Sequence, residues 1–97
     1  MYTATMEYRF DGNRKEKVCL LWRDRVLKLA ERQPGFVRMQ FLTSEDSALA
    51  VGTWESRSHA EEFMKTGVFR NLMEELKPLL AAEPIPRSWE LTFYSQA

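Results

Sequence analysis

Three side chains in the sequence could hold or activate a small oxygen-bearing molecule: His59, Trp54 and Tyr8. His59 is the only histidine, and an imidazole can act as a base near neutral pH or hydrogen-bond a phenol. The Trp54 indole N–H could donate to a ligand oxygen while its ring stacks on an aromatic substrate, and Tyr8 could carry a phenol into an apolar pocket. The alternatives are an exposed histidine at a helix start, a packing tryptophan and a buried tyrosine with one structural hydrogen bond.

Other kinds of site lack the residues they need. One histidine and one cysteine, Cys19, cannot form a multi-residue zinc cluster, and neither a phosphate-binding glycine loop nor a catalytic triad occurs, so we predict no metal and no cofactor. Fourteen basic and fourteen acidic residues are mixed along the chain, which excludes a nucleic-acid partner. The longest apolar runs, such as residues 18–22, are too short to span a membrane. A cytoplasmic globular protein is expected.

Two alternating periodicities define the elements that would position these side chains. Residues 2–10, 36–43, 48–54 and 87–95 alternate polar and apolar side chains, as strands do. Residues 15–32, and then 58–66 and 68–80, carry apolar stripes at helical spacing, with a break expected at Gly67. Ser56 or Ser58 is expected to cap the second helix. The order β-α-β-β-α-β predicts one α+β domain over residues 1–97, a ferredoxin-like fold with one four-stranded antiparallel sheet and two helices on one face.

The predicted sheet has two unequal faces. The helices are expected to cover the more apolar face, which collects Met6, Tyr8, Val37, Met39, Phe41, Trp89, Leu91 and Phe93. The opposite face collects Thr3, Thr5, Glu7, Arg9, Arg38, Gln40, Glu90 and Thr92, with Phe36, Leu42 and Tyr94 among them. This second face is either solvated or buried against a second copy, because two-fold symmetry brings each patch onto its own complement. Burial would require its charges to be mutually paired.

A pocket between helices and sheet would have soft, apolar walls. The residues expected to line it beside Trp54 are Met39, Phe41, Phe63, Phe69 and Met73, with His59 or Tyr8 as the polar group. Methionine side chains adapt to the shape of a ligand. An apolar wall with one or two polar groups favours a flat hydrophobic or aromatic molecule over a sugar or a phosphate.

Four short motifs follow one another in a familiar order: PGF at 34–36, TWES at 53–56, VF at 68–69 and ELKPLL at 75–80. With the β-α-β-β-α-β order, the chain resembles the antibiotic biosynthesis monooxygenase superfamily of dimeric α+β barrels. The resemblance implies a homodimer with a pocket in each subunit, between the helices and the apolar sheet face. Members of that family include cofactor-independent oxygenases of polycyclic aromatic compounds, quinol monooxygenases, haem-degrading enzymes and proteins without a known activity.

Several polar residues of that family are absent from this chain. The asparagine, tryptophan and histidine of the haem-degrading branch match Thr5 or Met6, Phe63 and Met73, and none of these can take over the polar or ligating role. Histidines that other members carry after TWES match Phe63 and Val68. A haem-degrading function is therefore disfavoured.

Two functions stay open at this point. The first is a cofactor-independent monooxygenase acting on a small aromatic or quinone-like compound, with His59, Trp54 and Tyr8 as catalytic residues. In that mechanism the substrate, as its enolate or phenolate, gives an electron to oxygen, and the protein supplies a dry pocket and hydrogen bonds. The alternative is a non-catalytic dimeric domain that binds a hydrophobic small molecule.

Overall fold

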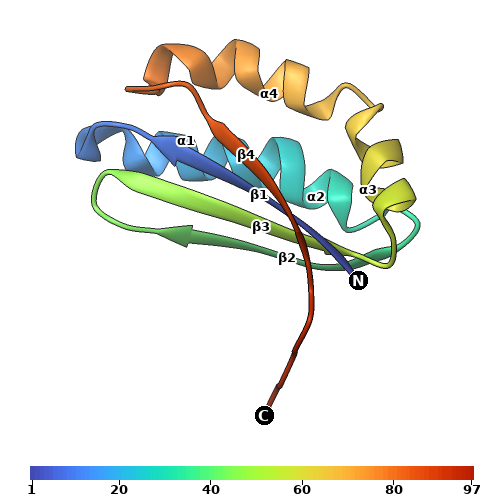
Figure 1. Ribbon diagram of the computed structural model, residues 1–97. Coiled ribbons are helices and arrows are strands. Elements are labelled where there is room, and N and C mark those ends of the chain that lie inside the picture. Colours follow the sequence, from blue (N-terminus) through green and yellow to red (C-terminus); the bar gives the residue numbers. More distant parts are fainter.

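The computed structural model describes all 97 residues and has the predicted element order. Its strands are β1 (Tyr2–Arg9), β2 (Phe36–Thr43), β3 (Ser47–Trp54) and β4 (Ile85–Glu90). The helices are α1 (Lys15–Trp22), α2 (Lys28–Ala30), α3 (Arg57–Met64) and α4 (Val68–Leu76), with short helical turns η1 (Gly12–Arg14), η2 (Arg23–Leu27) and η3 (Lys77–Leu79). The sheet is antiparallel with strand order β2-β3-β1-β4, and the helices cover one of its faces (Figure 1). The α+β, ferredoxin-like prediction is confirmed.

The first helix is continuous from η1 through α1 and η2 to α2, and its middle is a π-helical turn. Its buried residues recur every fourth position: Val18, Trp22, Val26 and Ala30. A regular helix of 3.6 residues per turn would rotate this stripe steadily away from the sheet, and the wider π turn reduces that drift. Arg25 in the π turn also donates two hydrogen bonds, of 2.7 and 3.0 Å, to the Glu75 carboxylate on α4. These bonds lower the pKa of Glu75 and tie the two helices together.

The second helix breaks where the sequence predicts. Gly67 has φ +81°, in the left-handed region, and separates α3 from α4. Ser56 is the N-cap of α3, with its hydroxyl oxygen accepting from the His59 backbone N–H at 3.3 Å. No helix in the structure is long and apolar enough to cross a membrane.

A β-bulge at the start of β2 exchanges the faces of two residues. Phe36 pairs with Trp54 but Arg38 already pairs with Thr53, so Val37 is an extra residue in this strand. Phe36 therefore packs edge-to-face on Trp54, with ring centroids 5.8 Å apart, on the helix-covered side. Val37 lies beside Arg38 on the opposite face. The expectation for Phe36 and Val37 was wrong because strict alternation cannot anticipate an inserted residue.

The last strand also differs from the prediction, in both its extent and its faces. Trp89 pairs with Thr3, and its indole N–H donates to the Thr5 hydroxyl at 2.9 Å, so its side chain lies on the face away from the helices. Ser88 and Pro86 take the helix side. Leu91 and Phe93, expected in the core, lie beyond the strand, and Phe93 is 91% exposed. The helix side of this edge strand borders a cavity, so small side chains suffice there.

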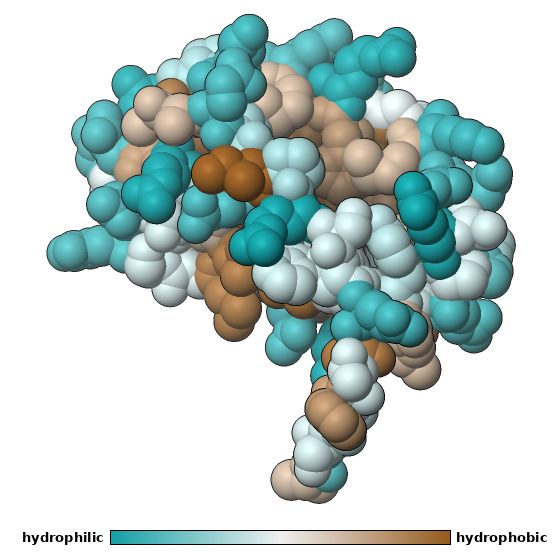
Figure 2. Space-filling model, viewed as in Figure 1, coloured by the Kyte–Doolittle hydropathy of each residue, from teal (hydrophilic) through white to brown (hydrophobic).

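The uncovered side of the sheet, called the open face below, combines polar residues of the central strands with apolar residues of the edges. Its members include Thr3, Thr5, Glu7, Val37, Arg38, Gln40, Leu42, Val51, Thr53 and Trp89. Residues 91–97 project from this side, and exposed apolar atoms follow the projecting segment (Figures 1 and 2). There the Tyr94 ring stacks on the Arg38 guanidinium, 4.4 Å from its carbon. Glu7 pairs with Arg9 of its own strand at 3.8 Å.

Candidate functional site

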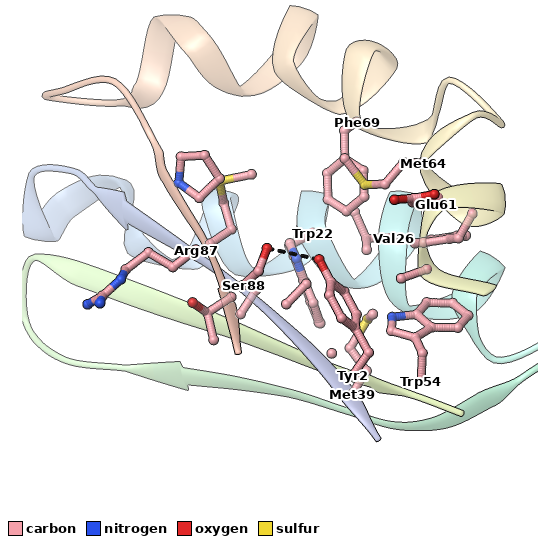
Figure 3. Close-up of a pocket in the computed structure, with 18 residues that line it drawn as sticks. Tyr2, Trp22, Val26, Met39, Trp54, Glu61, Met64, Phe69, Arg87 and Ser88 are labelled. Carbon is pink, nitrogen blue, oxygen red and sulfur yellow. Dashed lines mark hydrogen bonds between the residues drawn. The ribbon is translucent and has the colours of Figure 1, made fainter. Parts of the chain in front are cut away.

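An apolar cavity of about 370 Å³ separates the first helix, α3 and the start of α4 from the sheet (Figure 3). Every layer of the fold contributes to it. Its walls are Tyr2, Ala4, Thr5 and Met6 of β1, Met39 of β2, Ala50, Gly52 and Trp54 of β3, Pro86, Arg87 and Ser88 of β4, and Trp22, Val26, Ala60, Glu61, Phe63, Met64 and Phe69 of the helices. Of the eight residues predicted for the site, four line this cavity: Met39, Trp54, Phe63 and Phe69. The other four lie elsewhere.

Trp54 is held at one end of the cavity by a chain of aromatic contacts. Its ring centroid lies 5.1 Å from that of Phe63, which in turn packs edge-to-face on Phe69 at 5.8 Å. Trp54 is almost completely buried, and its nitrogen is on the side of the ring that faces Tyr2 (Figure 3). A Cβ added at Gly52 would lie 3.3 Å from this nitrogen and 2.9 Å from the Met39 Cε. Gly52 therefore keeps the floor open in front of the indole N–H.

A second polar feature joins β1 to β4 at the cavity wall. The Tyr2 hydroxyl donates to the Ser88 hydroxyl at 2.9 Å, a contact drawn in Figure 3. Both residues also border a neighbouring hollow of about 400 Å³ that includes Glu55, Arg57 and Glu90. The pair thus lies between an apolar and a polar space. Tyr2 is also the cross-strand neighbour of Trp54.

Glu61 is the acidic side chain in the lining. It comes from the middle of α3, and its carboxylate accepts a hydrogen bond from the Arg57 guanidinium at 2.8 Å. Both side chains are more than half exposed, so this pair contributes little to stability. The carboxylate can accept a proton or a hydrogen bond at the cavity wall.

His59 lies outside the cavity lining, on the first turn of α3. Its Nδ1 is 2.8 Å from the Ser56 hydroxyl, whose oxygen also caps the helix. Its ring packs directly on Gly35, where a Cβ would lie only 2.2 Å from the His59 Cγ. The imidazole therefore connects the helix start to the turn that precedes β2.

Tyr8 and Phe41 belong to the packed core rather than to the lining. Tyr8 is 1% exposed, its hydroxyl has no hydrogen-bond partner, and burial raises its pKa well above the ordinary value of 10.0. Phe41 stacks on Trp22, with ring centroids 4.4 Å apart. The centroid of the Tyr8 ring lies 6.3 Å from that of Phe41, in a tilted arrangement. A tyrosine with a raised pKa is a poor base at neutral pH.

Met73 lies one helical turn beyond Phe69 on α4. The cavity reaches only the first turn of that helix, so Met73 instead borders a separate hollow with Lys77 and Leu80. No three histidine, cysteine, aspartate or glutamate side chains are grouped so that they could hold a metal ion.

The chain is similar to one protein family and to solved structures of two oxygenases. Residues 1–75 match the family described as "Antibiotic biosynthesis monooxygenase". The structure resembles that of SnoaB, a cofactor-independent oxygenase from Streptomyces nogalater solved as a mutant, with a TM-score of 0.80 and 18% identity over 96% of this chain and 94% of that one. It also resembles the monooxygenase ActVA-Orf6 of Streptomyces coelicolor in complex with Nanaomycin D, with a TM-score of 0.82 and 19% identity over 99% of this chain and 91% of that one.

Another similar structure belongs to a protein whose function is not known. NE2512 of Nitrosomonas europaea, described as a protein of unknown function, has a TM-score of 0.83 and 12% identity over 99% of this chain and 93% of that one. No curated protein sequence matches the chain. At these identities the structural likeness concerns the fold.

Proposed function

The chain belongs to the antibiotic biosynthesis monooxygenase family, and from this premise we propose that it oxygenates a small aromatic or quinone-like compound without a cofactor. The observation that carries the proposal is the cavity of about 370 Å³ between helices and sheet, whose walls are mainly apolar and aromatic. Walls of this kind favour a flat hydrophobic molecule. SnoaB, which has the same fold, is a cofactor-independent oxygenase.

The chemistry rests on the substrate more than on the protein. In an anthrone, the ring CH₂ is conjugated through the fused aromatic rings with the carbonyl opposite it, so loss of a CH₂ proton gives an enolate. The enolate gives an electron to dioxygen, and the net change is CH₂ + O₂ → C=O + H₂O. The Trp54 N–H would stabilise the negative oxygen of the enolate, because a fixed donor in an apolar site favours the charge that develops there. Tyr2, Ser88 and Glu61 are the hydroxyl and carboxyl groups of the lining that could orient the substrate or accept its proton.

The alternative is a domain that binds such a molecule without transforming it. The positions of His59 and Tyr8 favour this second candidate, since the predicted base, His59, and the predicted phenol, Tyr8, both lie outside the cavity lining. Under this alternative the same apolar walls and the same Trp54 donor would hold the ligand.

Oxygen uptake with an anthrone separates the two functions. The proposal expects one O₂ consumed per anthrone converted to the quinone. A Trp54→Phe variant should be slower by about 10²–10³-fold, as for loss of one oxyanion donor. Binding of anthrone without oxygen uptake would establish the alternative. Absence of binding would contradict both. A His59→Ala variant decides whether the imidazole takes part from outside the cavity.

We further propose a cytoplasmic homodimer that buries the open face of each subunit. Three of its apolar residues are substantially exposed in the single chain: Val37 at 39%, Leu42 at 52% and Trp89 at 44%. Phe93 and Tyr94 are also exposed, and the C-terminal segment to which they belong projects on the same side of the sheet (Figure 1). Contiguous exposed apolar area of this kind marks an interaction surface, and a face that carries both Glu7 and Arg38 can complement a rotated copy of itself.

Replacing Val51 with lysine should dissociate this dimer. Val51 lies on the open face in a central strand, opposite Thr5 and Gln40, so a dimer would bury the new ammonium without a partner. Light scattering at micromolar concentration should give about twice the 11.4 kDa chain mass for the natural protein and the single mass for Val51→Lys. Leu20→Lys is the control, because Leu20 is an exposed apolar residue on α1. A natural protein of single mass would contradict the proposal.

A further inference from the structure

Two buried polar atoms have no hydrogen-bond partner in the whole chain: the Tyr8 hydroxyl and the Trp22 indole nitrogen. Buried polar groups are nearly always hydrogen-bonded, so an exception calls for an explanation such as a water or a ligand that completes the site. The two residues differ in one respect. Trp22 lines the cavity, whereas Tyr8 does not.

Trp22 is a buried residue of the first helix that stacks on the sheet. It is 2% exposed, stacks on Phe41 with an interplanar angle of 24°, and is the last residue of α1 before the π turn. π turns within helices are frequent at functional sites. The turn keeps both Trp22 and Val26 on the cavity wall. The ring is therefore held rigidly, with a polar atom unused, at the edge of an apolar space.

We propose that the Trp22 indole N–H is a ligand donor: it binds a carbonyl or phenolate oxygen of the aromatic molecule that occupies the cavity. This inference rests on the proposed binding of an aromatic compound there and adds a second donor, on the helix wall, to Trp54 on β3. An indole N–H donates and never accepts, so Trp22 selects an acceptor oxygen over a hydroxyl that must donate.

Access of a ligand oxygen to the Trp22 nitrogen requires a side chain of the wall to move. The nitrogen is covered by protein atoms. Met39 lies two residues before Phe41 on the same side of β2, and Met6 shares the row of Ala50 and Phe41 across the sheet. Both methionines line the cavity, and an unbranched thioether changes its rotamer easily. The proposal requires the ligand to move a side chain that covers the donor, and these two methionines are adaptable residues of the same wall.

The inference separates two ligands of the same shape. 9-Fluorenone carries one carbonyl on a planar tricyclic skeleton, and fluorene has the same skeleton without an acceptor. The natural protein should bind fluorenone about tenfold more tightly than fluorene, and Trp22→Phe should remove most of that preference. Tyr8→Phe is the matched control, because it also deletes an unpartnered buried polar atom but one away from the cavity; its preference should stay unchanged.

The indole N–H resonances in a proton–nitrogen spectrum give a second readout on the natural protein, which does not depend on how well Trp22→Phe folds. Fluorenone should shift the Trp22 resonance downfield, while fluorene should not. If fluorenone shifts only the Trp54 resonance, or if Trp22→Phe keeps the full preference, the Trp22 inference is wrong and the proposed function stands. If neither compound binds, the proposed function and the inference both fail.

Discussion

A Gly52→Val variant should lose ligand binding while keeping its fold. The Cβ at this position would lie 2.9 Å from the end of the Met39 side chain, which can move aside, and 3.3 Å from the Trp54 nitrogen. The two methyl groups would then fill the floor in front of the Trp54 N–H. Gly52 has no positive φ and lies within β3, where a β-branched residue fits the backbone.

We expect fluorenone affinity to fall by at least about tenfold, or ~1.4 kcal/mol, with the free energy of unfolding nearly unchanged. Titration calorimetry and urea denaturation measure the two quantities. Ala81→Val is the control, because Ala81 borders the separate hollow near Met73. Unchanged affinity in Gly52→Val would mean that the ligand binds elsewhere.

The largest loss of stability is expected from Gly35→Ala. Gly35 has φ +77°, a conformation that costs an alanine about 1–2 kcal/mol. The new Cβ would also lie 2.2 Å from the His59 Cγ, and relieving such an overlap typically costs a further 1–3 kcal/mol, roughly. The Gly35 carbonyl accepts a hydrogen bond from the Glu55 N–H at 2.8 Å, so a shift of this turn disturbs the end of β3 as well.

Two further variants separate the backbone cost of Gly35→Ala from the cost of its overlap with His59. Gly67→Ala has nearly the same backbone cost, with φ +81°, but nothing within 4 Å of its Cβ, so it should be the milder change. Adding His59→Ala to Gly35→Ala should restore the part due to overlap. Urea unfolding curves of the four proteins form the comparison. Equal losses in Gly35→Ala and Gly67→Ala would show that the imidazole yields freely.

The sequence predicts the elements well because hydrophobic periodicity reports which residues must be covered. The exceptions have local physical causes. The extra residue at Val37 reverses the faces of Phe36 and Val37 without altering composition. In β4, an edge strand beside a cavity, Trp89 lies on the open face and small side chains face the helices. A prediction from periodicity places the larger apolar residues on the face that the helices cover. This prediction fails for β4, because a cavity occupies the space that those side chains would fill.

The site is harder to predict for a related reason. Met39 and Phe41 lie on the same side of one strand, yet Met39 lines the cavity and Phe41 is closed off by Trp22. The hydrophobic pattern predicts which face of the sheet a side chain lies on, but not whether that side chain borders a cavity. The second property depends on which helix side chain covers each position. Tyr2, Ser88 and Glu61 were missed since their types are common at a surface. The pairing of Tyr2 with Trp54 was the available signal.

Three methionines, Met6, Met39 and Met64, stand in the cavity wall. In the proposed reaction, the substrate hydroperoxide that precedes the quinone would lie against thioether sulfur, to which it can transfer an oxygen atom. Oxidation to the sulfoxide turns a soft apolar side chain into a polar one, and cellular reductases can reverse it. Such a protein would have a finite number of turnovers, and its working lifetime would depend on repair. The same methionine side chains that let the cavity adapt to a ligand would also be the sites of its oxidative damage.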